Sequence, residues 1–327
     1  VAFSETNLCF PQLFNISCKK PKTSLSQVLL PYVVVFSVSL LTVALNLLVI
    51  VSVSHFRQLH TPTNILLLSL AVSDFLIGLL LMPAKILRDT ACWFLGQLTC
   101  SLYSYICFVI TSASVGIMVL ISVDRYVAIC DPLHYPTRIT DRRVKLCVCL
   151  CWLCSVFYNI LFIKDDLLQR ERHTSCYGEC VFVIDYIVGT TDIVLTFIAP
   201  VTVIVFLYMR VFVVAVSQAR AMRSHVTAVT LQLSVTLTAK KSELKAARTL
   251  GVLVLVFLLC FCPYYIVSFF GNELFNSSSA SIVIYLYYFN SCLNPLIYAM
   301  FYPWFRKAYS KNWKLLHIRD IYVYPDQ

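Results

Sequence analysis

Four ionisable residues stand inside long apolar stretches of the chain: Asp74, Asp124, Arg125 and Asp192. A charged side chain at membrane depth is costly, so residues of this kind usually serve a function. A carboxylate taken out of water needs a cation or a proton to offset its desolvation. Asp74 and Asp192 are therefore the first candidates for binding a cation, and the adjacent Asp124 and Arg125 form a separate charged pair.

The composition shows which kind of elements must position these residues. The chain has 327 residues, of which 59% are apolar and 13% charged, against about 25% charged residues in an average soluble domain. Its mean hydropathy is +0.80. This composition leaves too little polar surface for a water-soluble globule and predicts a membrane protein.

The apolar residues fall into seven runs of the length that spans a bilayer, about 20 residues each. They cover Leu25–Ser54, Thr61–Leu81, Cys100–Ile129, Val144–Ile163, Tyr186–Val214, Ala246–Phe270 and Ala280–Phe301. Hydrocarbon leaves only helices to satisfy the backbone of such segments in a protein that is not a barrel. Four prolines, Pro83, Pro200, Pro263 and Pro295, are expected to kink four of these helices.

The predicted fold is an all-α membrane protein, a seven-transmembrane helix bundle with a short amphipathic C-terminal helix. We expect an extracellular segment over residues 1–24, the helix domain over 25–302, and the amphipathic helix with a cytoplasmic tail over 303–327. Pro303–Leu316 would lie on the inner leaflet with its basic side chains toward anionic lipid headgroups. The first span would act as the signal anchor.

The basic residues predict the orientation. With the N-terminus outside, 18 of the 26 Lys and Arg residues lie on the cytoplasmic side, as the positive-inside rule requires. The glycosylation sequons at Asn15 and Asn276 then fall outside the cell. The net charge of +10 is a feature of the cytoplasmic face, so nucleic acid is not an expected partner.

The 15 cysteines separate into two groups under this topology. Nine lie in or at the ends of the spans and are expected to pack as small apolar side chains. Six are extracellular, an even number in an oxidising compartment, and allow three disulfides: Cys9, Cys18, Cys92, Cys100, Cys176 and Cys180.

Motifs in order along the spans resemble those of rhodopsin-family G-protein-coupled receptors. They are Asn46, Ser69–Asp74, Asp124-Arg125-Tyr126, Trp152, Pro200, Tyr208, Phe257, Cys260–Pro263 and Asn294–Tyr298. More narrowly, Asn290–Phe305 resembles the seventh-helix signature of trace amine-associated receptors. A retinal-binding opsin is excluded, because the seventh span lacks a lysine. A membrane transporter stays a remote alternative, although neither inverted repeats nor broken helices are visible.

The resemblance implies a ligand pocket with an unusual anchor. Aminergic relatives hold the ligand ammonium with an Asp 18 residues before the Arg of the Asp-Arg-Tyr motif, and here that position is Cys107. Asp192, eight residues before Pro200, resembles the anchor of a subgroup in which this carboxylate has moved to the fifth helix. Alternatively, Asp192 belongs to a polar network between helices.

Aromatic and hydroxyl side chains would complete this pocket, since aromatic faces attract an ammonium. Phe261 stands where most relatives carry Trp. Aromatic residues also pack without a ligand, and hydroxyls also bond to the helix backbone. The candidates are Phe108, Thr111, Ser112, Phe261, Tyr264, Tyr265, Tyr287 and Tyr288, with Tyr265 and Tyr288 preferred.

The resemblance also implies a sodium pocket and an activation switch. Asp74, Ser114, Asn290 and Asn294 would hold a sodium ion; alternatively, Asp74 is satisfied by hydrogen bonds alone. Arg125 would pair with Glu243 at rest and be released for the G protein on activation; alternatively, Glu243 is a solvated charge. The switch would further include Asp124, Tyr126, Tyr208, Phe257, Pro263, Pro295 and Tyr298.

For the extracellular cysteines the resemblance implies a central Cys100–Cys180 disulfide. We expect Cys9 to pair with Cys176 and Cys18 with Cys92.

These expectations describe a plasma-membrane receptor for small extracellular amines with no catalytic chemistry. Family practice would make it an olfactory receptor that raises cyclic AMP through a stimulatory heterotrimeric G protein, with arrestin as a further partner. The alternative is a rhodopsin-family receptor whose ligand is not an amine.

Overall fold

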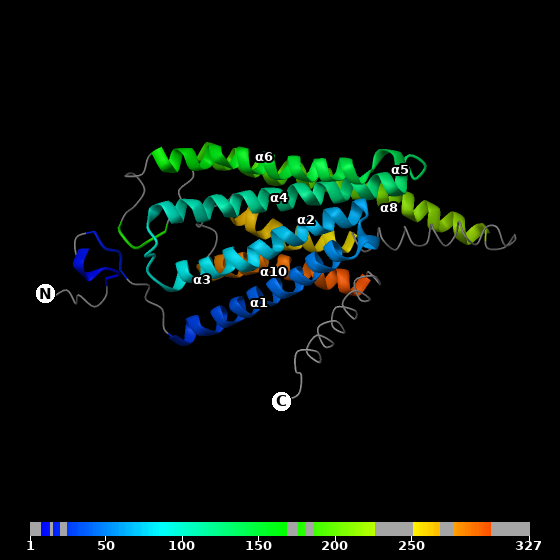
Figure 1. Cartoon of the computed structure of the whole chain (residues 1–327). Coiled ribbons are helices and arrows are strands. Elements are labelled where there is room, and N and C mark those ends of the chain that lie inside the picture. The colour runs from blue at the N-terminus through cyan, green and yellow to red at the C-terminus, as the bar shows by residue number, and fades with distance from the viewer. Residues whose placement is uncertain are drawn as a thin grey trace, which may run out of the picture.

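The computed structural model describes residues 8–13, 16–19, 25–168, 176–180, 186–225, 251–268 and 277–301. Long helices lie alongside one another in a single elongated bundle (Figure 1). They are α1 (Leu25–His55), α2 (Pro62–Leu76), α3 (Met82–Thr90), α4 (Gln97–Cys130), α6 (Asp141–Leu168), α7 (Tyr186–Ile193), α8 (Ala199–His225), Gly251–Ser268 and α10 (Ser277–Phe301). The prediction of an all-α membrane bundle is confirmed.

The bundle is apolar outside and partly polar inside, as a bilayer requires. Six of the described helices are long and apolar enough to cross a membrane, and α10 adds a helix of 25 residues. Phe157 and Phe206 on the outer surface are 65% and 62% exposed, whereas Asn46 and Ser122 inside are fully buried. The apolar side chains that face outward are available to lipid.

Helix α4 is the central element, because it packs against α2, α6 and α8. A small residue allows one of these contacts to be close: a Cβ atom at Gly116 of α4 would overlap the Sγ atom of Cys151 on α6. Trp152 Nε1 donates a 3.0 Å hydrogen bond to Ser69 Oγ, which joins α6 to α2. These contacts fix the helices on which the candidate site residues lie.

Two of the predicted proline kinks coincide with π-helical segments. η4 (Ile77–Leu81) lies just before Pro83, and η5 (Val194–Ile198) lies just before Pro200. Proline has no N–H to donate to the carbonyl four residues earlier, and a π turn shifts the hydrogen bonds to a spacing of five. Each segment therefore carries the helix past its proline and connects α2 to α3 and α7 to α8.

The second span is longer than predicted. It runs from Pro62 through η4 and α3 to Thr90, whereas the apolar pattern ends at Leu81. The helix continues because the Lys85 ammonium pairs with Asp89 one turn further on. This extension brings Lys85 and Arg88 into the bundle.

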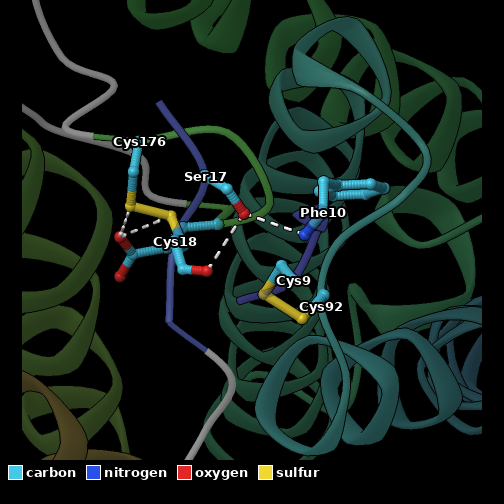
Figure 2. The surroundings of a disulfide bond; sticks show 7 residues. Cys9, Phe10, Ser17, Cys18, Cys92 and Cys176 are labelled. Atoms are coloured by element: carbon cyan, nitrogen blue, oxygen red, sulfur yellow. Dashed lines mark hydrogen bonds between the residues drawn. A yellow bond between two sulfur atoms is a disulfide. The ribbon is translucent and has the colours of Figure 1, made fainter. Parts of the chain in front are cut away.

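The N-terminal segment is tied to two loops at one end of the bundle. Leu8 and Lys19 form an antiparallel bridge, and Ser17 forms a parallel bridge with Tyr177. Figure 2 shows the two disulfides next to these contacts, and Ser17 Oγ accepting a hydrogen bond from the Phe10 amide.

The predicted pairing of the outer cysteines is wrong. Cys9 is bonded to Cys92 and Cys18 to Cys176, with Cα–Cα distances of 5.5 and 5.0 Å. The reason is the Ser17–Tyr177 bridge, which sets Cys18 beside Cys176 and leaves Cys9 to face the segment that precedes α4. The Cys100–Cys180 disulfide is present as predicted.

Candidate functional site

A cavity of about 620 Å³ opens among the helices near the end of the bundle that carries the disulfides. This volume lies in the range of small-molecule sites, about 300–1,000 Å³. Side chains from α3, α4, α7, η5, Gly251–Ser268 and α10 line it. The site is therefore built from helix ends that are far apart in the sequence.

Asp192 is the acidic side chain among those that line the cavity. It is the penultimate residue of α7 and is only 9% exposed. Tyr158 Oη on α6 donates a hydrogen bond to Asp192 Oδ1 across 3.4 Å. Thr196 Oγ1 donates to the backbone carbonyl of Asp192, at 2.8 Å, within the π turn. The carboxylate is thus sheltered and held, yet it still faces the cavity.

The walls beside Asp192 are aromatic. Tyr265 stacks on Phe197 with ring centres 4.0 Å apart. Tyr264 and Tyr287 lie 5.1 Å apart, and the Tyr287 hydroxyl shares a hydrogen bond with Thr111 Oγ1 of α4. This arrangement offers π faces and a few hydroxyls around one carboxylate, which suits an organic cation.

The structure brings together all but one of the predicted pocket residues. The cavity is lined by Cys107, Phe108, Thr111, Ser112, Asp192, Tyr264, Tyr265, Tyr287 and Tyr288. Phe261 is not among the lining side chains. It is 2% exposed and lies beneath the cavity, with its ring centre 4.3 Å from that of Phe257 and 4.9 Å from that of Tyr287.

Sequence reasoning missed several side chains of this site, including two cations and two tyrosines. Lys85, Arg88 and Tyr103 line the cavity, and Tyr158 contacts Asp192. The charges of Lys85 and Arg88 are visible in the sequence, but both residues follow the end of the apolar run at Leu81. Tyr158 carries no signal in the sequence, because its role depends on how α6 faces α7.

The predicted sodium-site residues are all buried, and two of them touch. Asn294 Nδ2 donates a 2.8 Å hydrogen bond to Asp74 Oδ2, and Asp74 is 1% exposed. Within the described part of the chain, Ser114 Oγ, Asn290 Oδ1 and Asn294 Oδ1 have no hydrogen-bond partner. A buried carboxylate bonded to Asn294, whose own Oδ1 has no partner among the described residues, fits a small hard cation, which prefers oxygen ligands.

At the opposite end of the bundle, Arg125 and Asp124 form a buried ion pair. Tyr135 Oη donates to Asp124 Oδ1 at 2.8 Å, and Arg125 Nη2 donates to Thr63 Oγ1 at 2.6 Å. Burial, reinforced by the negative charge of Asp124, raises the pKa of Tyr135 to about 12. Tyr135 therefore stays protonated and keeps donating to Asp124.

The other predicted switch residues that the structure describes lie on α4, α8, Gly251–Ser268 and α10. Phe257 and Tyr298 are buried, Pro295 lies inside α10, and Tyr126 packs with Ile129 and Val211. Tyr208 is next to Gly251, whose Cβ would stand 3.7 Å from Tyr208 Cε1. Pro263 lies within the Gly251–Ser268 helix. Glu243, the sequon residues Asn15 and Asn276, and the predicted helix Pro303–Leu316 lie outside the described residues.

The loop after α4 carries a second, exposed charge cluster. Asp131 bonds to His134 Nδ1 at 2.7 Å and pairs with Arg138 at 3.1 Å. The hydrogen bond with His134, assisted by the positive charge of Arg138, holds the pKa of Asp131 below its usual range. This cluster keeps the loop folded beside the Asp124–Arg125 pair.

Comparison with known proteins identifies the class to which this architecture belongs. Residues 45–298 match the pattern described as "7 transmembrane receptor (rhodopsin family)". The chain therefore belongs to the rhodopsin family of seven-helix receptors. It is a multi-pass membrane protein of a class that is not enzymatic and that binds small ligands and G proteins.

Similar curated proteins show to which group of the rhodopsin family the chain belongs. Trace amine-associated receptor 13c of Danio rerio is 37% identical over 322 residues, which cover 94% of this chain and 92% of that protein. Trace amine-associated receptor 7e of Mus musculus is 38% identical over 321 residues, with 94% and 88% covered. Trace amine-associated receptor 1 of Homo sapiens is 34% identical over 307 residues, with 90% and 91% covered. Within the rhodopsin family, the chain belongs to the trace amine-associated receptors.

Proposed function

We propose that this receptor binds small extracellular amines and that Asp192 is the residue that holds the ligand ammonium. The observation that carries the proposal is the sheltered carboxylate of Asp192 in an aromatic-walled cavity. Among the described residues, the hydrogen bond from Tyr158 is long, at 3.4 Å, so the carboxylate keeps capacity to accept hydrogen bonds from a ligand.

The aromatic side chains that line the cavity favour a cationic ligand over a neutral one. Tyr264, Tyr265, Tyr287 and Tyr288 all line the cavity with Asp192. An aromatic face attracts a desolvated cation by about 0.5–2 kcal/mol. Several such faces and one carboxylate together favour an ammonium over an uncharged group of the same shape.

The position of the acid affects how the amine lies. Cys107 of α4 lines the cavity but carries no charge to offer. With the acid on α7, the ammonium points toward the α6–α7 side of the bundle. A ligand is therefore reversed relative to one held by a third-helix Asp.

The signalling that we propose is the kind that the family resemblance implies. We propose coupling to a stimulatory G protein that raises cyclic AMP, a plasma-membrane location with the N-terminus outside, glycosylation at Asn15 and Asn276, and a role in olfaction. Arrestin and anionic inner-leaflet lipids are the further partners of this proposal. Arg125 is the side chain that would be freed for the G protein, with Glu243 as its resting partner.

We also propose that the Asp74 cluster takes up sodium in the resting receptor. The supporting observation is the buried Asp74 carboxylate in contact with Asn294, whose Oδ1 has no hydrogen-bond partner among the described residues. A bound cation would offset the cost of burying the Asp74 charge.

The test of the amine site pairs a charge-removing variant with a charge-keeping one. A panel of aromatic and aliphatic amines is compared with the corresponding alcohols, which keep the shape but lack the charge. Asp192→Asn is expected to weaken amine agonists at least about a hundredfold, roughly 2.7 kcal/mol. Asp192→Glu, which retains the carboxylate, should lose less.

Surface expression is matched by an epitope tag on the N-terminus. An undiminished amine response of Asp192→Asn, or equal responses to amines and alcohols, would favour a non-amine ligand. Asp192 would then serve the network with Tyr158.

A further inference from the structure

The cavity has a second charged end opposite Asp192. Lys85 and Arg88 of α3 line it together with Asp192 of α7. Helix α3 packs against α1, whereas Asp192 is bonded to Tyr158 of α6. A single pocket thus carries basic groups on one side and an acid on the other.

The basic end keeps a net positive charge among the described residues. Lys85 Nζ lies 2.6 Å from Asp89 Oδ1, and Arg88 Nε lies 3.9 Å from the same oxygen. Two cations therefore share one carboxylate. Asp89 itself does not line the cavity, so the unbalanced charge is the one presented to a ligand.

Arg88 is held so that its guanidinium stays near the cavity. Its Cζ atom lies 5.9 Å from the centre of the Tyr103 ring, a distance at which a cation and an aromatic face attract each other. Only about a third of its side chain is exposed. Among the described residues, the weak contact with Asp89 leaves most of the guanidinium donors for another acceptor.

The neighbouring position on α4 does not neutralise this end. Cys107 lines the same cavity as Arg88 and Lys85. An Asp at this position would pair with the two cations. The thiol leaves their charge in place, so the third helix contributes to the positive end by lacking an acid.

We infer that the ligand carries an acidic group as well as an amine: an ω-amino acid whose ammonium binds Asp192 and whose carboxylate binds Arg88 and Lys85. This inference rests on the proposed function, because it takes Asp192 as the ammonium site. A guanidinium binds a carboxylate through two parallel hydrogen bonds. A monoamine leaves the basic end unpaired, and a diamine places its second ammonium against like charge.

The test compares probes of equal length that differ in one terminal group. The series are the linear ω-amino acids, monoamines and α,ω-diamines of three to seven carbons, for example 5-aminopentanoate, pentylamine and 1,5-diaminopentane. Activation is read with biosensors for each Gα class. At the best length, the amino acid should be at least tenfold more potent than the monoamine, and the diamine should be the weakest of the three.

Arg88→Gln and Lys85→Gln identify the partner of the carboxylate. Arg88→Gln should lower the ratio of amino-acid to monoamine potency about tenfold, and surface expression measured with the N-terminal tag reports correct folding. Lys164→Gln is the matched control, since Lys164 is an exposed cation on α6 that does not line the cavity. It should change neither response.

The results of these experiments distinguish failure of the amino-acid inference from failure of the proposed amine site. If monoamines act through Asp192 but the amino acids are weaker or silent at every length, the inference is overturned and the amine site stands. An amino-acid advantage that survives both Arg88→Gln and Lys85→Gln also overturns the inference. Silence of both series, or responses that Asp192→Asn leaves unchanged, overturn the proposed amine site as well.

Discussion

Tyr158 on α6 donates its hydroxyl hydrogen to the Asp192 carboxylate on α7, with 3.4 Å between the two oxygens. The contact joins two helices at the anchor of the proposed ligand site. It orients the carboxylate without satisfying it, since the distance exceeds that of a normal O–H···O hydrogen bond.

Tyr158→Phe should therefore weaken amine agonists by about five- to tenfold, far less than Asp192→Asn. The substitution leaves the charge but frees the carboxylate to rotate, and a net hydrogen bond contributes about 1 kcal/mol. Concentration–response curves at matched surface expression measure the shift. Tyr105→Phe is the control, because Tyr105 also bonds from α4 to α6 but does so to the Val156 carbonyl, away from the cavity. Equal shifts in both variants would contradict a specific role for Tyr158.

Cys107→Asp should change the preference toward diamines. The new carboxylate would share the cavity with Lys85 and Arg88, offset their positive charge and accept a second ammonium. We expect the ratio of diamine to monoamine potency to rise at least tenfold, provided that the diamine spans the gap between α4 and α7. Cys107→Asn, which adds a polar group of similar size without charge, should leave the ratio unchanged. A ratio that rises equally in both variants would argue against charge as the cause.

Gly116→Ala should destabilise the bundle, because its methyl group would overlap Cys151 Sγ. Overpacking of this kind costs typically about 1–3 kcal/mol. A lower Tm of the detergent-solubilised receptor would report it, and Cys151→Ala in the same chain should restore much of the loss by removing the sulfur. Gly251→Ala is the matched control, since its nearest neighbour would lie at an ordinary 3.7 Å. No rescue by Cys151→Ala would rule out this contact as the cause.

The disulfide pairing predicts how strongly single and double cysteine variants impair delivery of the receptor to the cell surface. Cys9→Ser/Cys92→Ser should impair surface delivery no more than either single change, because both remove one bond. Cys9→Ser/Cys18→Ser breaks two bonds and should be worse. Cys100→Ser or Cys180→Ser should cost most, since that bond anchors the loop to the start of α4. Flow cytometry of tagged receptors measures delivery, and unreduced peptides joining Cys9 to Cys176 would contradict the pairing.

Asp124→Asn should raise ligand-independent signalling several-fold. The variant removes the charge that holds Arg125 in its buried pair and so destabilises the resting state selectively. Basal G-protein activation at equal expression is the measurement. Glu243→Ala should act in the same direction if Glu243 also restrains Arg125, whereas Arg125→Ala should lose coupling and keep ligand binding. An unchanged basal level in Asp124→Asn would mean that the pair is not a restraint.

The helices and much of the pocket could be predicted because they depend on patterns local to the chain. Apolar length predicted α1 and α4 to within a few residues, and the resemblance to aminergic receptors predicted that Cys107, 18 residues before Arg125, lines the cavity. The end of the second span was predicted too early. The length of an apolar run indicates how much of a helix contacts lipid. It misses α3, which continues the span as an amphipathic helix with Lys85 and Arg88 lining the cavity.

The disulfide error and the position of Phe261 involve contacts between segments that are distant in the sequence. Which of Cys92 and Cys176 pairs with Cys9 depends on the bridge between Ser17 and Tyr177, which no spacing in the sequence encodes. The position of Phe261 below the cavity similarly depends on how its helix rotates against α10, where Tyr287 covers it.

The π turn η5 directly follows Asp192 and Ile193, and it gives the local helix one residue more than a regular turn would hold. Removing one residue there would rotate everything before it by about 100° around the helix axis. Asp192 would then leave the cavity, and a neighbour in the sequence would take its place. A deletion or insertion of a single codon in this segment, and not only a substitution, therefore gives evolution a direct route to moving the acid of this receptor around its binding site.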